Sequence, residues 1–194
     1  MTNQGERYDL MAADFAKLRD SFNTEQKYID LLIDYLKPGS SILDLGCGSG
    51  FPIASYLIDH GFKLTGVDAS IELLKIAKIN CPTMECIYGD LRYVELNKQY
   101  DAIIEWWALF HIPKEDHAKM IARFASWLKP GGILEFTTGD HEYADSSSDM
   151  LNQELYFYSH APKFYEQQLK ENGFEILLSE NDQETHLVWI AKKS

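Results

Sequence analysis

The sequence predicts an α/β protein of the doubly wound class, with helices on both faces of a mostly parallel sheet. Between Ser41 and Thr138, short apolar runs alternate with segments of helical periodicity, and strand–helix–strand units of this kind produce parallel sheets. A glycine-rich turn over residues 46–50 separates the first apolar run from the first helix of this series. In open α/β sheets, nucleotide-like ligands bind at such a junction, so the turn is also the first candidate site.

The composition fits one folded domain with its own core. The 194 residues are 45% hydrophobic, and both values are ordinary for a single globular domain. Acidic residues outnumber basic ones by 30 to 18, for a formal net charge of −12, which disfavours a nucleic-acid partner because phosphates need a basic surface. We expect N-terminal helices over 1–40, an alternating core over 41–138 and a closing segment over 139–194.

Cysteine usage and hydropathy indicate the compartment. The three cysteines, Cys47, Cys81 and Cys86, are an odd number and form no disulfide framework. No apolar run approaches the ~20 residues of a membrane span, and the polar opening residues do not resemble a signal peptide. We therefore expect a protein of the reducing cytoplasm without a membrane partner.

Two amphipathic helices are expected before the first strand. Apolar residues recur at helical spacing over 9–19 and again over 29–36. Asn23-Thr24 can cap the second helix, and Lys37-Pro38-Gly39 ends it.

The first strand, Ser41–Leu45, leads into glycines at 46, 48 and 50, and a helix is expected over 51–60. Glycine lets the backbone turn sharply and brings bare N–H groups close to a ligand. The dinucleotide fingerprint needs a third glycine where Phe51 stands, and no lysine follows Gly50 as a P-loop requires. Asp44, just before the glycines, would repel phosphate and attract an amino group. An ordinary strand-to-helix turn is the alternative.

Two more acidic residues follow the next two expected strands. Asp68 ends the strand over 63–67, twenty residues after Gly48, where a carboxylate can accept both hydroxyls of a ribose. Asp68 and Ser70 would otherwise cap the helix expected over 71–80. Asp90 follows the strand over 84–88 in a Gly-Asp turn, which by itself is a weak signal.

In order and spacing, these three strand ends resemble the first three motifs of class I S-adenosylmethionine-dependent methyltransferases of the single-domain, small-molecule type, over residues 42–91. The resemblance implies a Rossmann-like sheet of seven strands with the last one antiparallel, and S-adenosylmethionine as cofactor. It also implies an N-terminal lid, with Tyr8, Phe15 and Arg19 in the pocket; plain packing of these side chains is the alternative. The cofactor-binding residues that it implies are Asp44, Gly46, Cys47, Gly48, Asp68, Ala69, Asp90, Leu91, Glu105 and Trp106.

The loop after the fourth strand, Tyr100–Glu105, is rich in aromatic residues and reads Trp-Trp-Ala-Leu-Phe-His. A tryptophan ring attracts a cation, so Trp106 and Trp107 can cover a sulfonium. His111 matches a position where the family often has histidine, and it would serve as general base for the atom that receives the methyl group. The alternative is that His111 bonds a backbone carbonyl and fixes the loop.

A helix over 113–127, a Pro-Gly-Gly turn and a fifth strand, Ile133–Thr138, complete the alternating series. The polar stretch over 139–148 is expected to be a mobile loop. It contains Asp140, His141 and Glu142, but three adjacent residues rarely converge on one ion, so we expect no metal site. A helix over 161–172 and two closing strands, 174–178 and 186–191, end the chain.

The segment Leu155–His160 alternates like a strand and places Tyr156, Tyr158 and His160 on one face. These side chains either line a substrate pocket together with Trp107 and Phe110, or they cover a sheet edge.

We therefore expect a methyltransferase that acts on a small neutral or cationic molecule by in-line transfer, with no metal. His141 and His160 are reserve candidates for the base. The alternatives are a non-catalytic S-adenosylmethionine-binding or regulatory protein, and a methyltransferase that acts on a protein or RNA.

Overall fold

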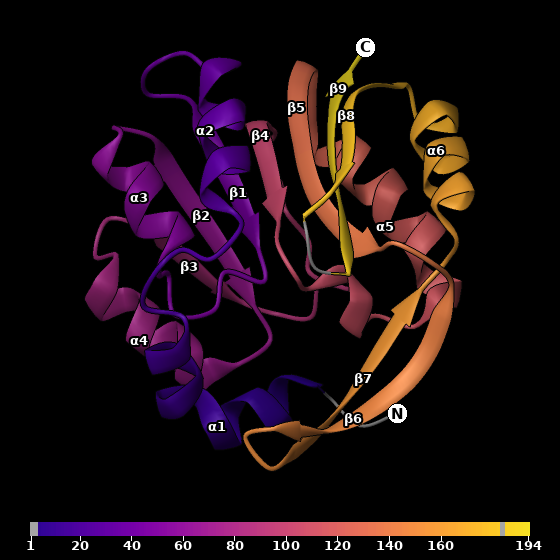
Figure 1. The fold of residues 1–194 in the computed structure, drawn as a ribbon. Helices are drawn as coiled ribbons and strands as arrows, with labels where there is room; N and C mark the ends of the chain where they lie inside the picture. Colours follow the sequence, from indigo (N-terminus) through magenta and orange to yellow (C-terminus); the bar gives the residue numbers. More distant parts are fainter. Residues whose placement is uncertain (1–3, 183–184) are drawn as a thin grey trace.

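A seven-stranded sheet runs through the centre of the molecule (Figure 1). The structure is a computed structural model that describes residues 4–182 and 185–194, with the backbone alone described for 145–149. The strands lie in the order β3-β2-β1-β4-β5-β9-β8. Their bounds are β1 (Ser41–Leu45), β2 (Lys63–Asp68), β3 (Glu85–Tyr88), β4 (Tyr100–Glu105), β5 (Leu128–Gly139), β8 (Phe174–Asn181) and β9 (His186–Lys193).

The pairing confirms the predicted architecture. Strand β1 is parallel to both β2 and β4, and β4 is parallel to β5. The last strand, β9, is antiparallel and lies between β5 and β8. Parallel pairing places the carboxyl ends of β1, β2, β3 and β4 along one edge of the sheet, where the sequence predicted the ligand.

Helices cover both faces of the sheet (Figure 1). On one face, apolar side chains of α2, α3 and α4 form a core with one set of strand residues, and on the other face α5 and α6 pack on the alternate set. The bounds of these helices are α2 (Gln26–Asp34), α3 (Ile53–Asp59), α4 (Ile71–Asn80), α5 (Lys114–Trp127) and α6 (Pro162–Glu171). None of the helices in residues 4–182 and 185–194 is long and apolar enough to cross a membrane.

Helix α1 (Gln4–Leu18) and a hairpin of β6 (Tyr143–Met150) and β7 (Gln153–Ser159) lie outside these layers. They meet at the end of the molecule that the carboxyl ends of the parallel strands face (Figure 1). Together with the short 3₁₀ helix η1 (Leu109–His111), they enclose that edge of the sheet.

The hairpin corrects one sequence-based expectation. Residues 139–148 were expected to form a mobile loop, but β6 begins at Tyr143 and pairs antiparallel with β7. Backbone hydrogen bonds hold this two-stranded ribbon, and Leu155 of β7 is fully buried, so β6 needs no apolar face of its own. The residue at the start of α2 is Glu25, not Asn23 or Thr24, and its side chain makes no cap hydrogen bond.

Asp101 ties together the amino ends of three neighbouring strands. Its Oδ2 accepts hydrogen bonds from the backbone N–H of Ser41 at 2.8 Å and from the Ser41 hydroxyl at 2.7 Å. Its Oδ1 lies 2.8 Å from Lys129 Nζ. Partial burial alone would raise the pKa of Asp101, but the bonds from Lys129 and Ser41 lower it to about 2.

Replacing Asp101 with Asn should lower the free energy of unfolding by about 1–2 kcal/mol at pH 7, the usual scale for lost hydrogen bonds. The folded-state pKa lies below the unfolded value near ~3.9, so this contribution is complete above pH 4 and is lost as the pH falls toward 2. Urea unfolding at pH 7 and pH 3 measures it, with the exposed Glu166→Gln as control. A difference between wild type and Asp101→Asn that is equal at both pH values would contradict this assignment.

Candidate active site

A cavity of about 510 Å³ lies at the carboxyl ends of the parallel strands. Its volume is in the range of small-molecule sites, roughly 300–1,000 Å³. The glycine turn and the ends of β1, β2 and β3 form its floor, and the loop after β4, α1 and β7 form its walls. Of the predicted residues, those that line it are Tyr8, Phe15, Arg19, Asp44, Gly46, Cys47, Gly48, Asp68, Ala69, Asp90, Leu91, Trp106, Trp107, Phe110, His111, Tyr156 and Tyr158.

The glycine turn is anchored to β2 and approached closely by the loop after β4. The N–H groups of Gly46 and Cys47 donate to the carbonyl of Val67 at 2.8 and 3.2 Å. Gly46 has a φ of +80°, and a Cβ there would stand 2.4 Å from the Cβ of Ala108. Gly48 has a φ of +53° and open space around its Cα, with the nearest atom, in the Phe15 ring, 3.9 Å from a Cβ there. The turn is therefore compact below and open toward the cavity.

Asp68 is held in place by the glycine turn and by the start of α4. Its carboxylate accepts from Gly48 N at 2.8 Å and from Ser70 N at 2.7 Å. Ser70, in turn, caps α4 by accepting from Leu73 N at 3.1 Å, so the capping alternative applies to Ser70 while Asp68 faces the cavity. Burial raises the pKa of Asp68 to about 6 despite these N–H bonds.

Asp44 is the second carboxylate on the cavity floor and is only 3% exposed. Burial, and then the nearby Asp68, raise its pKa to about 7. A cationic group placed between the two would favour the ionised form of both. The pair thus suits a ligand that brings a positive charge.

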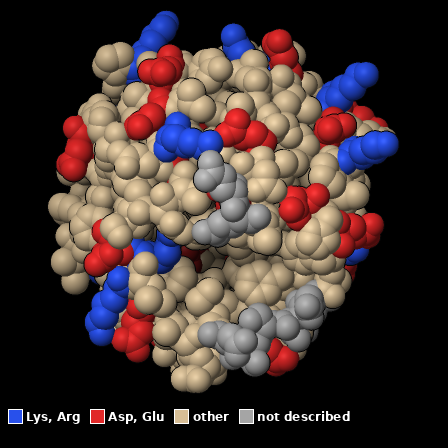
Figure 2. All heavy atoms as spheres, viewed as in Figure 1, with Lys and Arg blue, Asp and Glu red and all other residues tan. Residues whose placement is uncertain are grey.

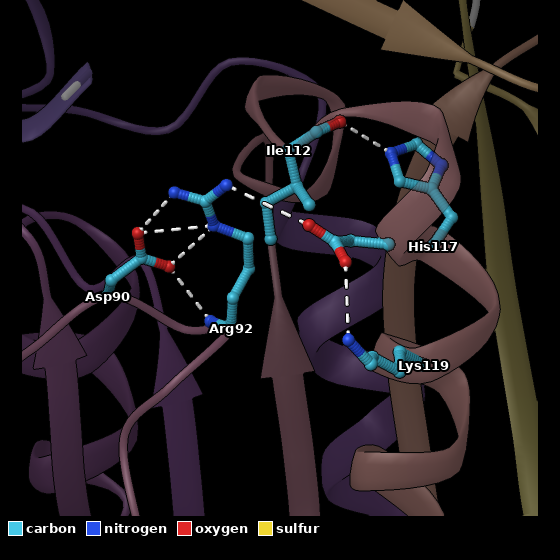
Figure 3. A network of polar contacts seen from close by, with 6 residues as sticks. Asp90, Arg92, Ile112, His117 and Lys119 are labelled. Carbon is cyan, nitrogen blue, oxygen red and sulfur yellow. Dashed lines mark hydrogen bonds and ion pairs between the residues drawn. The ribbon is translucent and has the colours of Figure 1, made fainter. Parts of the chain in front are cut away.

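At the far end of the cavity, Asp90 is paired with Arg92, which the sequence did not single out. Arg92 donates to both carboxylate oxygens of Asp90, from Nε at 3.0 and 3.2 Å and from Nη2 at 2.6 Å (Figure 3). Burial would raise the pKa of Asp90, but the bonds from Arg92 lower it. The guanidinium also lies 3.7 Å from Asp116 of α5. Asp90 is thereby held ionised and rigid beside Leu91.

Glu105, expected at the cofactor, lies beneath the cavity instead. Its Oε1 accepts from the N–H groups of Ala108 and Leu109 at 2.6 and 2.5 Å, so it fixes the turn after β4. The side chain is fully buried, and burial raises its pKa to about 8 even though the N–H bonds oppose this. Its role is to shape the loop that carries His111.

The aromatic wall is larger than the sequence predicted. Phe157, which was not singled out, lines the cavity with its ring 4.9 Å from His111 and 5.4 Å from Phe110. His160, by contrast, lies outside the cavity lining: its Nε2 is 3.0 Å from the Lys114 carbonyl and its ring stacks on Phe164 at 3.8 Å. β7 ends at Ser159, so the predicted alternation stops before His160.

His111 is placed between α1 and β7, and its tautomer follows from its partners. Nδ1 lies 3.0 Å from the carbonyl oxygen of Tyr156, which can only accept, so Nδ1 carries the proton. Nε2 lies 2.9 Å from the Tyr8 hydroxyl and is therefore the acceptor. Burial lowers the pKa of His111 to about 4, so the ring is neutral at physiological pH. The carbonyl bond anticipated as an alternative is present, and it leaves Nε2 unprotonated and hydrogen-bonded to the Tyr8 hydroxyl.

The fully buried His117 supports the same loop, and the sequence analysis did not single it out. His117 Nε2 donates to the Ile112 carbonyl at 2.7 Å (Figure 3), and its Nδ1 accepts from the Tyr165 hydroxyl at 2.8 Å. The Tyr165 oxygen also accepts from His160 N at 3.1 Å. The network connects α5, α6 and the end of β7 to the segment next to His111.

Among the residues with described side chains, no group of three or more histidine, cysteine or acidic side chains is arranged to hold a metal ion. Asp140 and His141 pair with each other, with Nδ1 2.5 Å from Oδ1, and Glu142 pairs with Lys114. His141 is exposed and does not line the cavity.

Comparison with known proteins gives a consistent family assignment. A family model described as a methyltransferase domain matches residues 15–179. Phosphoethanolamine N-methyltransferase 3 of Arabidopsis thaliana is 25% identical over 183 residues, which cover 90% of this chain and 36% of that protein. Ubiquinone biosynthesis O-methyltransferase of Coxiella burnetii is 37% identical over 123 residues, which cover 58% of this chain and 48% of that protein. The chain thus spans less than half the length of both relatives.

The fold also matches a solved structure. Magnesium protoporphyrin IX methyltransferase from Synechocystis PCC 6803, crystallised with S-adenosylmethionine, has a TM-score of 0.77 at 19% identity, with 98% of this chain and 95% of that chain covered.

The close approach of Gly46 and Ala108 can be tested with a matched glycine. Gly39 has a φ of +78°, like Gly46, but nothing lies within 4 Å of a Cβ there. Gly39→Ala should cost about 1–2 kcal/mol of stability through backbone strain alone, whereas Gly46→Ala should cost clearly more because the Ala108 methyl group must move. Adding Ala108→Gly should recover the difference. Equal urea midpoints for Gly39→Ala and Gly46→Ala would show that the contact carries no energy.

Proposed function

The chain belongs to the methyltransferase domain family, and on this premise we propose that it is a class I enzyme that transfers a methyl group from S-adenosylmethionine to a small-molecule acceptor. The observation that carries the proposal is that one cavity joins the glycine turn and its carboxylates to an aromatic chamber containing a neutral, oriented histidine.

The floor of the cavity fits this cofactor. Gly48 leaves open space where a side chain would stand, and Asp68 presents its carboxylate next to it, which suits a ribose. Asp44 suits the ammonium of the amino-acid end, Asp90 and Leu91 suit the adenine, and Trp106 lines the same cavity. When bound, the cofactor supplies a methyl group on a sulfonium, whose sulfur is an activated leaving group.

The protein contributes orientation, exclusion of water and a proton acceptor. Helix α1 and β7 close the chamber, so the acceptor is held against the floor and away from bulk solvent. His111 Nε2 takes the proton that the acceptor atom loses, while the Tyr156 carbonyl keeps Nδ1 protonated and the ring fixed. The Tyr8 hydroxyl donates a hydrogen bond to Nε2. The N–H or O–H of the methyl acceptor therefore either replaces the Tyr8 hydroxyl at Nε2 or donates a hydrogen bond to the Tyr8 oxygen.

Two alternatives are disfavoured by specific observations. A protein that only binds the cofactor needs no chamber beyond the floor, whereas six aromatic side chains line one here: Trp107, Phe110, His111, Tyr156, Phe157 and Tyr158. For an RNA substrate, the net charge of −12 is unfavourable, and the basic side chains on the face in Figure 2 do not merge into a broad surface. The two relatives are named for phosphoethanolamine and for ubiquinone biosynthesis, which favours a small acceptor.

We also propose that residues 1–194 act as one domain with α1 as a lid, that transfer requires no metal, and that the enzyme works in the reducing cytoplasm. The three cysteines in the described chain are unpaired, which supports the last point.

The function is tested by incubating the purified protein with tritiated-methyl S-adenosylmethionine and a cell extract that has been separated by molecular size. We expect label in the low-molecular-mass fraction, together with release of S-adenosylhomocysteine. Transfer of label to protein or RNA alone would overturn the small-molecule assignment. Binding of the cofactor with no transfer in any fraction would support the non-catalytic alternative.

Replacing His111 with Gln should reduce kcat by about 10²–10⁴-fold, the usual contribution of a general base. Because burial lowers the pKa of His111 to about 4, the base form is present above that value, so wild-type turnover should not vary with His111 ionisation between pH 6 and 9 and should fall as the pH approaches 4. The exposed His141→Gln is the matched control and should keep wild-type turnover. A His111→Gln variant with near wild-type kcat would refute the general-base role of His111 and would indicate that the enzyme acts by positioning its substrates alone.

A further inference from the structure

Tyr165 of α6 places a hydroxyl group inside the apolar core. Its side chain is fully buried, and its ring lies against the rings of Phe136 and Trp189. A phenylalanine ring would fill the same space, so the hydroxyl adds only its hydrogen bonds, without which its burial would cost free energy. Burial raises the pKa of Tyr165 to about 12, so the hydroxyl keeps its proton and can donate it.

The partners of this hydroxyl determine the direction of each bond. It lies 2.8 Å from His117 Nδ1, and Nε2 of the same ring lies 2.7 Å from the Ile112 carbonyl oxygen (Figure 3). Burial lowers the pKa of His117 to about 4, so the ring carries one proton, which the carbonyl requires on Nε2. Tyr165 therefore donates to Nδ1, and its oxygen accepts from the backbone N–H of His160 at 3.1 Å.

These two bonds lead to opposite sides of His111. Ile112 directly follows His111, so the bond from His117 fixes the chain at the end of η1. His160 directly follows β7, the strand whose Tyr156 carbonyl oxygen lies 3.0 Å from His111 Nδ1. One hydroxyl therefore links the segment that carries the His111 ring to the segment that orients it.

We propose that the Tyr165 hydroxyl is a positioning group that holds η1 and β7 in register, so that the Tyr156 carbonyl keeps the His111 ring in one orientation and one tautomer. Tyr165 does not line the cavity, so it acts on His111 only through these two segments. The inference rests on the proposed function for the importance of His111, but the state of the ring can be measured without any methyl acceptor.

The test compares ¹⁵N-histidine-labelled wild type with Tyr165→Phe by NMR, which distinguishes a protonated from an unprotonated ring nitrogen. In the wild type, His111 should be a single tautomer with its proton on Nδ1, and the signals that disappear in His111→Gln identify it. Tyr165→Phe keeps the ring but removes both bonds, so the Tyr156 carbonyl should no longer hold Nδ1. Because the Tyr8 hydroxyl can donate or accept, His111 should then be a mixture of both tautomers.

The same variant is measured in the methyl-transfer assay. Its kcat should fall about 10–100-fold, the scale for a misplacement of about 1 Å caused far from the reacting atoms. Its affinity for S-adenosylmethionine should be unchanged, because Tyr165 does not contact the floor of the cavity.

Tyr100→Phe is the matched control. Tyr100 is a buried tyrosine of the same core, but its hydroxyl has no hydrogen-bond partner among the described residues. This variant should keep the His111 signals and kcat of the wild type. Because Tyr165→Phe leaves His117 Nδ1 without its donor, Tyr165→Phe/His117→Gln is measured beside it. The glutamine keeps an N–H donor for the Ile112 carbonyl, and this variant should show the same mixture of tautomers.

A single His111 tautomer with its proton on Nδ1 in both Tyr165 variants would overturn the proposal, whatever their melting temperature or kcat, and would leave Tyr165 a structural role. An equal change in Tyr100→Phe would also overturn it, because the loss of any core hydroxyl would then suffice. A wild type that transfers no methyl group, combined with the change of tautomer in the Tyr165 variants, would refute the proposed function and support the positioning of His111.

Discussion

The site depends on the parallel pairing of β1 with its two neighbours, because this pairing brings the ends of β1, β2 and β4 to one edge in a fixed register. Asp44 lies opposite Gly66 of β2, and a Cβ at Gly66 would stand 2.7 Å from Cys47 Sγ. The missing side chain lets the glycine turn fold back onto β2, where Val67 accepts its N–H groups. The glycine turn, the carboxylates of Asp44 and Asp68, and the loop after β4 then line the same cavity.

This dependence explains why the floor of the cavity could be predicted from the sequence. Strands β1, β2 and β3 follow one another along the chain, and each ends in a recognisable turn or acidic residue, so chain order alone places Asp44, Asp68 and Asp90 at the same edge. The strand-to-helix alternation further predicted the two covered faces, and only the bounds of elements such as α1 and β5 moved by several residues.

The walls could be predicted only in part, because they depend on contacts between distant segments. The bond between Tyr8 and His111 joins residues 103 positions apart, and no local pattern records it. The sequence correctly predicted that Glu105 ends a strand. The direction of its carboxylate, beneath the cavity, depends on the fold of the turn that follows. Strand β6 was missed because residues 139–148 are polar. It pairs with β7 through backbone N–H and C=O groups, which do not depend on the side chains.

The bond from His111 to Tyr156 is made to a main-chain carbonyl rather than to the tyrosine side chain. The orientation of the His111 ring is therefore independent of which amino acid occupies position 156, provided that β7 keeps its path. Substitutions at this wall position can reshape the cavity while the His111 ring keeps its place. If the proposed function is correct, single side-chain changes in the hairpin can admit new methyl acceptors without displacing His111, so the hairpin is the segment to diversify in directed evolution.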